Sequence, residues 1–498
     1  MTGNGRSATS TQRGRFAQMR QMTHHYFAID GGSGAHLLEA LSGRYPYIQQ
    51  VASPRHADLL LVVEPINRKL APAVGELARA LPRPARILTV GEPGAERDHF
   101  PGNDIVRVEE LFPGSHRVAL TSVESVFEAM LRSEQWPTTE KIEQPTVEEA
   151  TIQLPSKQEQ EMATELVVLS LGPVQPFTAG PLRLLLICDG EQVLSAQQEA
   201  GYASRGIAGA MTRMDWPQAL PLARRLDPLA PLASQLAYVR AVEQLQGWQP
   251  ASQVAMLREA ALAMERAQNV LWWLVRFARI LADAALTGRA NQLASRLAGD
   301  IAQSWRQAPF TWVLPQLQVP FATVAGNTEA MARRQKIATE VEALRRDIER
   351  NRLFALRTRG IGVLATERLK EAGVSGPDLA GSADGAGDVQ SRVLARLDAA
   401  TIDLRQAGEV LAAGESAPTR AASWDAPAGE ARVTVRGPRG DIGLRLVSEG
   451  EEQLAHVEWQ RPSAALLPLL PETVAGQKLA DAEIIIASLD LAMAEADG

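Results

Sequence analysis

The sequence predicts two folded units, an α/β unit over residues 26–132 and a mainly α-helical unit with β-hairpins over residues 164–498. Three observations predict this division. In the first segment short apolar strands alternate with amphipathic helices, which is typical of a mainly parallel sheet covered by helices. Residues 133–163 are polar, acidic and interrupted by proline, as linkers between independently folding units are. After this linker a strand hairpin and several long helical patterns follow.

The first unit begins with an apolar strand that ends in the glycine-rich turn 31–34. Its second strand is continuously apolar, which indicates a strand that is covered on both faces. The predicted elements are, in order, a strand at 26–30, a helix opening at 37–41, a strand at 58–63, a helix at 72–80, strands at 85–90 and 105–108, and a helix at 118–131.

In the second unit, Asp189-Gly190 is typical of a hairpin turn, and residues 329–353 carry apolar residues on one helix face. The predicted strands are 166–171, 182–188, 192–196, 432–436, 442–447 and 456–460; the predicted helices are 251–286 and 329–353; loops are expected at 373–388 and 413–429.

Composition limits the class of protein. A chain of 498 residues is too long for one core, and its formal net charge of −7 gives no general reason to expect nucleic acid. A single cysteine excludes an internal disulfide framework and fits a reducing compartment. No apolar run reaches the roughly 18 to 20 residues of a spanning helix. Membrane association would therefore come through the surface or through a partner.

Residues 1–29 contain no acidic residue and carry four arginines among Ser, Thr, Gln and Gly. We expect a basic disordered tail over residues 1–25. A tail that touches anionic lipid or an acidic partner is an alternative, and a transit peptide is a minor one.

Ligands for soft metals are scarce. Cys188 is the only cysteine, and no histidine occurs between residues 117 and 455. Thiolate and imidazole groups hold zinc, nickel and iron–sulfur clusters, and a cluster needs about four of them in one place. Cys188 itself follows an apolar strand and is expected to be a small buried hydrophobe.

The second unit resembles the large, quinone-site subunit of respiratory complex I and the related large subunit of energy-converting nickel–iron hydrogenases. The resemblance implies a mainly α-helical hydrogenase-large-subunit-like fold with peripheral β-hairpins. It rests on an ordered set of motifs, namely Ser170–Pro173, Pro176–Arg183, Cys188–Glu191, Gly201-Tyr202, Arg205–Ile207, Leu236–Glu243, Asn351–Phe354, Thr358–Leu364, Gly437–Gly443, Leu446–Gly450, Arg461–Ser463 and Ser488–Asp490.

The first unit looks like the small partner subunit, which carries the terminal four-iron cluster in complex I. The resemblance implies a flavodoxin-like α/β fold and, since the two subunits are normally separate chains, a gene fusion. It rests on Asp30–Ser33, Ala52–Val62, Asn67–Ala73, Thr89–Gly91 and Phe112–Gly114. A short flexible linker would hold such units at an effective concentration in the millimolar range.

The positions at which the family binds cofactors are changed in this chain. The resemblance places the four cluster cysteines at Gly34, Leu37, Pro93 and Ser115. It places the two quinone-site histidines at Gln175 and Ala179 and the quinone-site tyrosine at Pro228. The nickel ligands would fall at Asp227, Ala230, Ala492 and Glu495. We therefore expect no iron–sulfur cluster, no nickel–iron centre and no other cofactor, and we expect no catalytic residue. Gln175 could still donate a hydrogen bond to a quinone.

Other candidate sites carry less chemistry. His36, His99 and His116, with Glu92, could form a mixed metal site if the cluster loops converge, but solvated or capping histidines are the simpler expectation. Arg205 and Arg439 are expected to hold the interface between the units by ion pairs. The glycine-rich turn lacks the lysine and the spacing of a phosphate-binding loop. Trp272 and Trp273 are expected in the core.

The preferred hypothesis is a cofactor-free structural or coupling subunit of a complex I-like or hydrogenase-related membrane assembly. It would dock on the cytoplasmic face of membrane subunits related to ion-translocating antiporters, with other hydrophilic-arm subunits as further partners. One alternative is an oxidoreductase subunit that still binds quinone. The other is a soluble assembly or binding factor.

Overall fold

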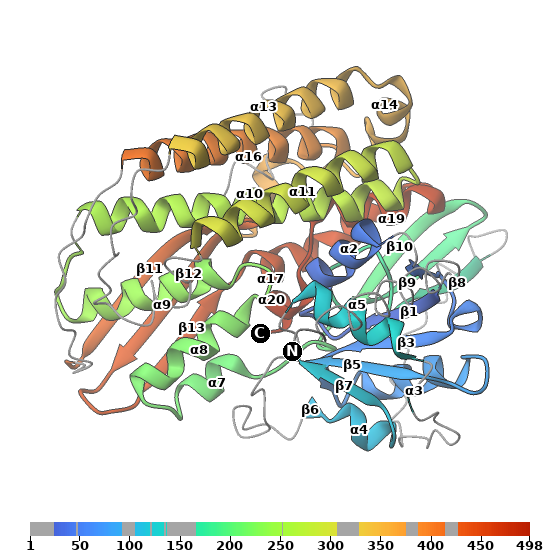
Figure 1. The fold of residues 1–498 in the computed structure, drawn as a ribbon, viewed down its shortest axis with the longest axis horizontal. Coiled ribbons are helices and arrows are strands. Elements are labelled where there is room, and N and C mark those ends of the chain that lie inside the picture. Colours follow the sequence, from blue (N-terminus) through green and yellow to red (C-terminus); the bar gives the residue numbers. More distant parts are fainter. Residues whose placement is uncertain are drawn as a thin grey trace, which may run out of the picture. The chain divides into compact units, whose positions relative to one another are not determined.

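The computed structural model describes residues 24–45, 48–91, 105–119, 122–133, 136, 166–250, 252–305, 328–374, 387–413 and 427–498 (Figure 1). The chain forms two compact units. Unit 1 comprises residues 1–97 with 104–149, and unit 2 comprises residues 98–103 with 150–498. Most of the expected linker 133–163 and residues 1–23 of the expected tail 1–25 lie outside the described residues, whereas His24 and His25 begin a strand and were wrongly assigned to the tail.

Unit 1 is built on a five-stranded parallel sheet with the strand order β2-β1-β3-β5-β7, beside a short antiparallel β4–β6 ribbon. Its elements are β1 His24–Asp30, α2 Ala35–Arg44, β2 Ile48–Gln50, η1 Pro54–His56, β3 Leu59–Val63, β4 Ile66–Asn67, α3 Ala71–Arg79, β5 Ile87–Gly91, β6 Ile105–Val106, α4 Val108–Leu111, β7 His116–Ala119 and α5 Val123–Leu131.

Every residue of β3 is buried, which explains its unbroken apolar sequence. Successive strand residues point to opposite faces, so a strand with this pattern must be covered on both. Leu61 and Val63 belong to a core cluster with Leu41 of α2 and with Val126 and Met130 of α5.

The helix expected over residues 118–131 is partly wrong. Residues 116–119 form strand β7, which pairs with β5, and the helix starts only at Val123. Ser122 begins it with a capping box: its hydroxyl accepts from the Ser125 N–H at 3.1 Å. The strand expected at 105–108 is also shorter, because α4 begins at Val108.

Unit 2 joins two three-stranded antiparallel sheets, β10-β9-β8 and β11-β12-β13, to many helices. Its elements are β8 Leu166–Leu171, β9 Arg183–Asp189, β10 Gln192–Glu199, α7 Ile207–Met211, α8 Trp216–Leu226, α9 Pro231–Leu245, α10 Ser252–Ile280, α11 Ala284–Trp305, α13 Thr328–Arg350, α14 Arg352–Thr358, α15 Thr366–Glu371, α16 Val389–Ala413, β11 Gly429–Gly437, β12 Gly440–Ser448, β13 His456–Gln460, α17 Pro462–Leu466, η4 Leu467–Leu469, α18 Leu470–Val474, α19 Leu479–Leu489 and α20 Met493–Asp497.

Helices α10, α11, α13 and α16 run side by side as the long helices of Figure 1. Two of them were expected to be longer. The pattern over 251–286 is broken because Ala282 adopts a left-handed φ of 56° and the Asp283 carboxylate accepts from the Leu286 N–H at 2.9 Å. The pattern over 329–353 ends at Arg350, and Asn351 caps the separate helix α14.

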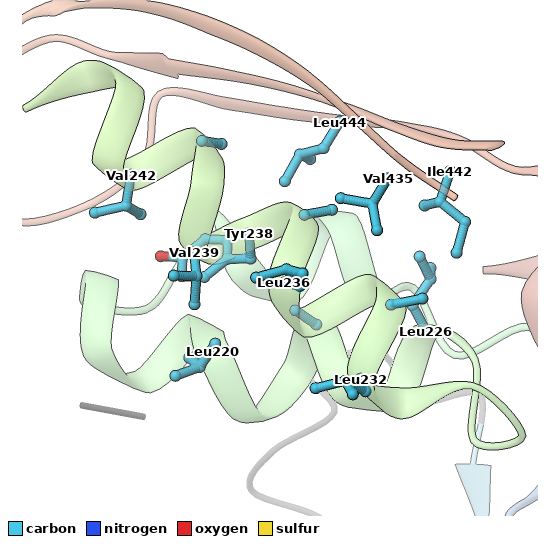
Figure 2. Close-up of a cluster of buried hydrophobic side chains, with 14 of the residues drawn as sticks. Leu220, Leu226, Leu232, Leu236, Tyr238, Val239, Val242, Val435, Ile442 and Leu444 are labelled. Carbon is cyan, nitrogen blue, oxygen red and sulfur yellow. The ribbon is translucent and has the colours of Figure 1, made fainter. Parts of the chain in front are cut away.

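Helix α9 packs between helix α8 and the β11–β12 hairpin (Figure 2). Leu236 and Val239 of α9 share a buried cluster with Val435 and Leu444 of the hairpin. The Tyr238 hydroxyl donates to the Trp216 carbonyl at 2.8 Å, which satisfies its only polar group. This packing fixes the start of α9 relative to the tip of the hairpin, where the candidate site lies.

Candidate functional site

Segments that are far apart in the sequence meet at the C-terminal end of unit 2. Ala179 forms a parallel bridge with Ala492: its N–H donates to Leu491 at 2.9 Å, and the Met493 N–H donates to Ala179 at 2.8 Å. A position expected to face a quinone thus lies beside a position expected to hold nickel.

Arg439 is the centre of this region. It lies in the tight turn Gly437–Gly440 between β11 and β12, and its side chain is only 2% exposed. Its guanidinium donates to a carboxylate oxygen of Asp227 and, through Nε, to Glu495 Oε2 at 3.0 Å. Asp227 and Glu495 are 0% and 1% exposed. All three charged groups are therefore removed from water.

The four positions expected to hold nickel come together around Arg439. Asp227 ends α8, and its carbonyl accepts from the Ala230 N–H at 3.1 Å. Glu495 lies in α20, where its carboxylate accepts from the Ser463 hydroxyl. The same hydroxyl accepts from the Ala492 N–H at 3.2 Å. We call Asp227, Arg439, Ser463, Asp490 and Glu495 the buried ion-pair cluster.

Asp490 extends the cluster to two further arginines. Its carboxylate pairs with Arg276 of α10 at 2.8 Å and with Arg396 of α16 at 3.2 Å, and lies 4.0 Å from Arg439. Arg396 also lies over the ring of Trp273, 4.8 Å from its centroid. The cluster thus ties the hairpin and the C-terminal segment to the long helices.

Burial and the neighbouring charges shift the pKa values of Arg439 and Glu495 in opposite directions. Burial alone would lower the pKa of Arg439, but the charges of Asp227, Glu495 and Asp490 outweigh it and raise the pKa above its ordinary value. Burial raises the pKa of Glu495, and the Arg439 charge partly offsets that rise. Arg439 therefore stays charged, and Glu495 needs it as a partner in order to stay ionised.

Glu265 is a further buried acid near the cluster that the sequence reading missed. Its carboxylate accepts from the Leu232 and Ala233 N–H groups, at 2.8 and 3.0 Å, in the first turn of α9. Burial raises its pKa from 4.5 to about 8, although these bonds and the Arg439 charge lower it. A signal was present, since α10 carries Glu265 and other polar residues within an otherwise apolar stretch.

These residues do not fit a nickel–iron centre. Ala230 and Ala492 offer no side-chain donor, and the carboxylates of Asp227 and Glu495 already bind the Arg439 guanidinium. Over the described part of the chain, no group of three or more His, Cys, Asp or Glu side chains is arranged to hold a metal ion.

Gln175, one of the expected quinone-site residues, uses its side chain to hold its own loop. The Gln175 amide donates to the Thr178 hydroxyl and, at 3.3 Å, to the Gly180 carbonyl. Its oxygen accepts from the Phe177 and Thr178 N–H groups at 2.7 and 3.0 Å. The side chain thus closes its own turn, and its donors are already engaged. Pro228 is half-buried next to Asp227 and offers no hydrogen-bond donor.

The described cluster positions of unit 1 do not fit an iron–sulfur cluster. A Cβ on Gly34 would lie 2.7 Å from Val63 Cγ1, so the packing has closed over this position. Leu37 is a buried member of the apolar core, and Ser115 carries a hydroxyl. Pro93 lies outside the described residues.

The glycine-rich turn of unit 1 is closed by its own acid. Asp30 Oδ1 accepts from the Gly32 and Gly34 N–H groups at 2.9 and 2.7 Å. These are the groups that would bind a phosphate at the start of α2. A carboxylate in this place disfavours phosphate.

Two of the remaining expectations are confirmed, and the one for the ion pairs of Arg439 is wrong. Cys188 is 1% exposed, and burial raises the pKa of its thiol; Trp272 and Trp273 are buried as expected. Arg439 forms its ion pairs with Asp227 and Glu495 of unit 2, so these pairs do not join the units. Arg205 donates to the Leu226 and Ala494 carbonyls of the same unit. The expectation failed because partners more than 200 positions apart cannot be paired from sequence.

The possible histidine site of unit 1 is only partly described. His116 stacks on Trp136, with ring centroids 4.4 Å apart, and His36 lies in α2. His99 and Glu92 lie outside the described residues. A mixed metal site at these loops therefore stays a prediction.

Comparison with known proteins finds similarity to subunits of respiratory membrane complexes. Residues 409–498 match the family described as "Respiratory-chain NADH dehydrogenase, 49 Kd subunit". This segment contains Arg439, Asp490 and Glu495 of the ion-pair cluster.

Individual relatives extend the similarity beyond that segment. The chain is 25% identical over 409 residues to an NADH-quinone oxidoreductase subunit of Methylacidiphilum infernorum, covering 67% of this chain and 92% of that protein. It is 27% identical over 393 residues to the corresponding NADH-quinone oxidoreductase subunit of Roseiflexus castenholzii, covering 67% and 93%.

A solved structure shares the fold. The match is to a chain of the membrane-bound sulfane sulfur reductase, described as an archaeal respiratory membrane complex, with a TM-score of 0.60. It covers 68% of this chain and all of that chain, at 22% identity. Among the described residues of the present chain, no helix is long and apolar enough to cross a membrane.

Proposed function

We propose that this protein is a structural or coupling subunit of a respiratory membrane assembly of the complex I type, and that it carries no redox cofactor of its own. One observation carries the proposal. The Arg439 guanidinium binds the carboxylates of Asp227 and Glu495. These two residues stand at positions where the resemblance to nickel–iron hydrogenases places nickel ligands. A buried cation of the protein itself thus takes the place that a metal ion would need.

The cluster gives unit 2 a mechanical role in place of a chemical one. Arg439 links the β11–β12 hairpin to the end of α8 through Asp227 and to the C-terminal helix α20 through Glu495. Asp490 links the same region to α10 and α16. A displacement of any of these elements would separate buried charges, which is costly. We therefore expect the linked elements to move together as one rigid body.

The proposal also includes the fusion of small-subunit-like and large-subunit-like units and docking on antiporter-like membrane subunits. The parallel sheet of unit 1 and the similarity of the chain to NADH-quinone oxidoreductase subunits support this reading. The Gln175 contacts speak against the alternative of quinone binding, because the amide donors are used within the turn.

Metal analysis tests the cofactor-free part. The full chain would be purified without oxygen, and its iron, nickel and acid-labile sulfide would be measured against protein concentration. We expect all three to be far below one per chain. Stoichiometric iron with sulfide, or stoichiometric nickel, would overturn the proposal.

Co-purification tests the docking part. Tagged full-length protein would be isolated from gently solubilised membranes of its own source, beside a tagged soluble protein as the control. We expect integral membrane subunits to elute with it in fixed ratio. A monodisperse monomer without such subunits would refute docking and would favour a soluble factor.

A further inference from the structure

Helix α14 exposes two leucines to an unusual degree. Leu353 and Leu356 are 75% and 74% exposed, the highest values among the large exposed hydrophobic residues of the described chain. Single exposed apolar side chains need no explanation. These two lie three positions apart and so share one face of the helix.

The fold holds α14 in this position. Asn351 caps the helix: its side-chain oxygen accepts from the Leu353 and Phe354 N–H groups at 3.0 and 3.2 Å. Phe354 is buried and lies against Phe277 of α10, with ring centroids 6.3 Å apart. The Thr358 hydroxyl, also buried, donates to the Phe354 carbonyl at 2.7 Å. The exposure of the leucines is therefore fixed by an anchored helix.

Three arginines flank the leucines in the sequence. Arg350, Arg352 and Arg357 are exposed and pair with no carboxylate among the residues that the structure describes. The carboxylates at this end of α13 are already bound, Asp347 to Arg289 at 2.7 Å and Glu349 to Arg345 at 2.6 Å. Arg352 and Leu356 are four positions apart, as are Leu353 and Arg357, so each leucine has a cationic neighbour.

We propose that α14 and its flanking arginines bind the surface of an anionic lipid bilayer. The two leucines would enter the boundary between headgroups and acyl chains, and Arg350, Arg352 and Arg357 would bind lipid phosphates. Helices that lie in this interface carry apolar side chains such as leucine on one face and arginine or lysine beside them. Unpaired cations near the membrane are attracted to its anionic lipids.

Other occupants fit this surface less well. A second copy of the chain would bring the same unpaired arginines together, and their repulsion would oppose the contact. Two leucines on a seven-residue helix offer far less than the roughly 800 Å² per partner of a stable protein interface. A bilayer needs no shaped partner surface. The contact goes beyond docking through membrane subunits and does not depend on whether unit 2 carries a cofactor.

Flotation with lipid vesicles tests the proposal. The full chain would be mixed with vesicles of phosphatidylcholine alone or of equal parts phosphatidylcholine and phosphatidylglycerol. We expect binding to the anionic vesicles and a decrease at high salt, because salt screens the arginine–phosphate attraction. The double variant Leu353→Ser, Leu356→Ser should bind about tenfold more weakly, since it loses apolar burial but keeps every charge.

Matched controls separate this surface from the rest of the chain. The double variant Met256→Ser, Ile402→Ser changes two other exposed hydrophobics and should bind as the wild type does. Arg352→Gln with Arg357→Gln should weaken binding and reduce its salt dependence. Circular dichroism should show that all variants remain folded.

Three results would overturn the proposal. Unchanged binding of the leucine variant would assign lipid binding to charge elsewhere, such as the basic segment 1–25. Equal binding to both kinds of vesicle would exclude the role of the arginines. No binding to either would exclude the bilayer and would favour an acidic protein surface as the partner of α14.

Discussion

Replacing Arg439 by methionine should strongly destabilise unit 2. Methionine keeps much of the side-chain volume but removes the cation, which leaves Asp227 and Glu495 buried without their partner. Breaking a buried ion pair from one side costs about 3–5 kcal/mol. Glu495 alone gives a similar figure: keeping its carboxyl neutral at pH 7, against an ordinary pKa of 4.5, costs about 3 kcal/mol.

The loss of stability caused by Arg439→Met should depend on pH. At pH 5 the cost of keeping the Glu495 carboxyl neutral falls to about 1 kcal/mol. In the variant the folded state would hold this proton while the unfolded chain releases it, so stability falls as the pH rises above 5. The difference between Arg439→Met and the wild type should therefore be larger at pH 7 than at pH 5.

Urea unfolding followed by tryptophan fluorescence measures this effect, because Trp216 and Trp273 are buried in unit 2. The midpoint should fall without a change in the denaturant slope. Arg445→Met is the matched control on the same hairpin: Arg445 pairs with Glu430 on the surface, and exposed pairs contribute little. Equal shifts of the urea midpoint for Arg439→Met and Arg445→Met would contradict this prediction. So would a loss of stability, relative to the wild type, that is the same at pH 5 and pH 7.

Three further predictions concern single residues. Burial raises the pKa of Glu265 to about 8, so the folded state binds more protons than the unfolded chain between about pH 5 and pH 8. The free energy of unfolding should therefore fall as the pH rises through this range. Glu265→Gln should remove this contribution and flatten the plot of urea midpoint against pH. Gly34→Ala should destabilise unit 1 by about 1–3 kcal/mol, seen as a lower thermal midpoint, because the new Cβ meets the Val63 side chain. Gly288→Ala in α11 should raise the thermal midpoint of unit 2, with a gain of about 0.5–1 kcal/mol, because its Cβ meets no atom within 4 Å; a loss of stability would contradict this.

Much of the fold follows from local pattern. Strand β3 and the hairpin over β11 and β12 lie where the sequence predicts them. Burial of β3 on both faces requires an unbroken apolar sequence, and the hairpin turn is bounded by two glycines that can be recognised in the sequence. The break between α10 and α11 could not be predicted. Alanine is a good helix former, and only the tertiary structure places Ala282 in a left-handed conformation.

The candidate site shows the same limit. Asp227, Glu495 and Arg439 are all candidates from the sequence, but the ion pairs of Arg439 were expected at the interface between the units. Asp227 lies 212 positions from Arg439, and residue types alone do not say which acid an arginine will meet. Glu265 was not expected at the site, because an acid on a helix is most often solvated, although the polar residues within the apolar stretch of α10 are a signal of buried polar groups. Its role depends on the first turn of α9, which only the fold brings to it.

The three carboxylates of the buried ion-pair cluster are matched by an equal number of arginines, two of which lie next to the cluster. Three carboxylates, Asp227, Asp490 and Glu495, form ion pairs with three arginines, Arg276, Arg396 and Arg439, so these six groups are balanced without a further ion. The hairpin sets the position of the central arginine, because Gly440 has a φ of 134° that favours glycine and closes the turn against Gly437. A metal cation entering this cluster would have to displace Arg439 and leave a buried guanidinium unpaired. The same contacts that should make Arg439→Met destabilising therefore also oppose the binding of a metal ion at this place.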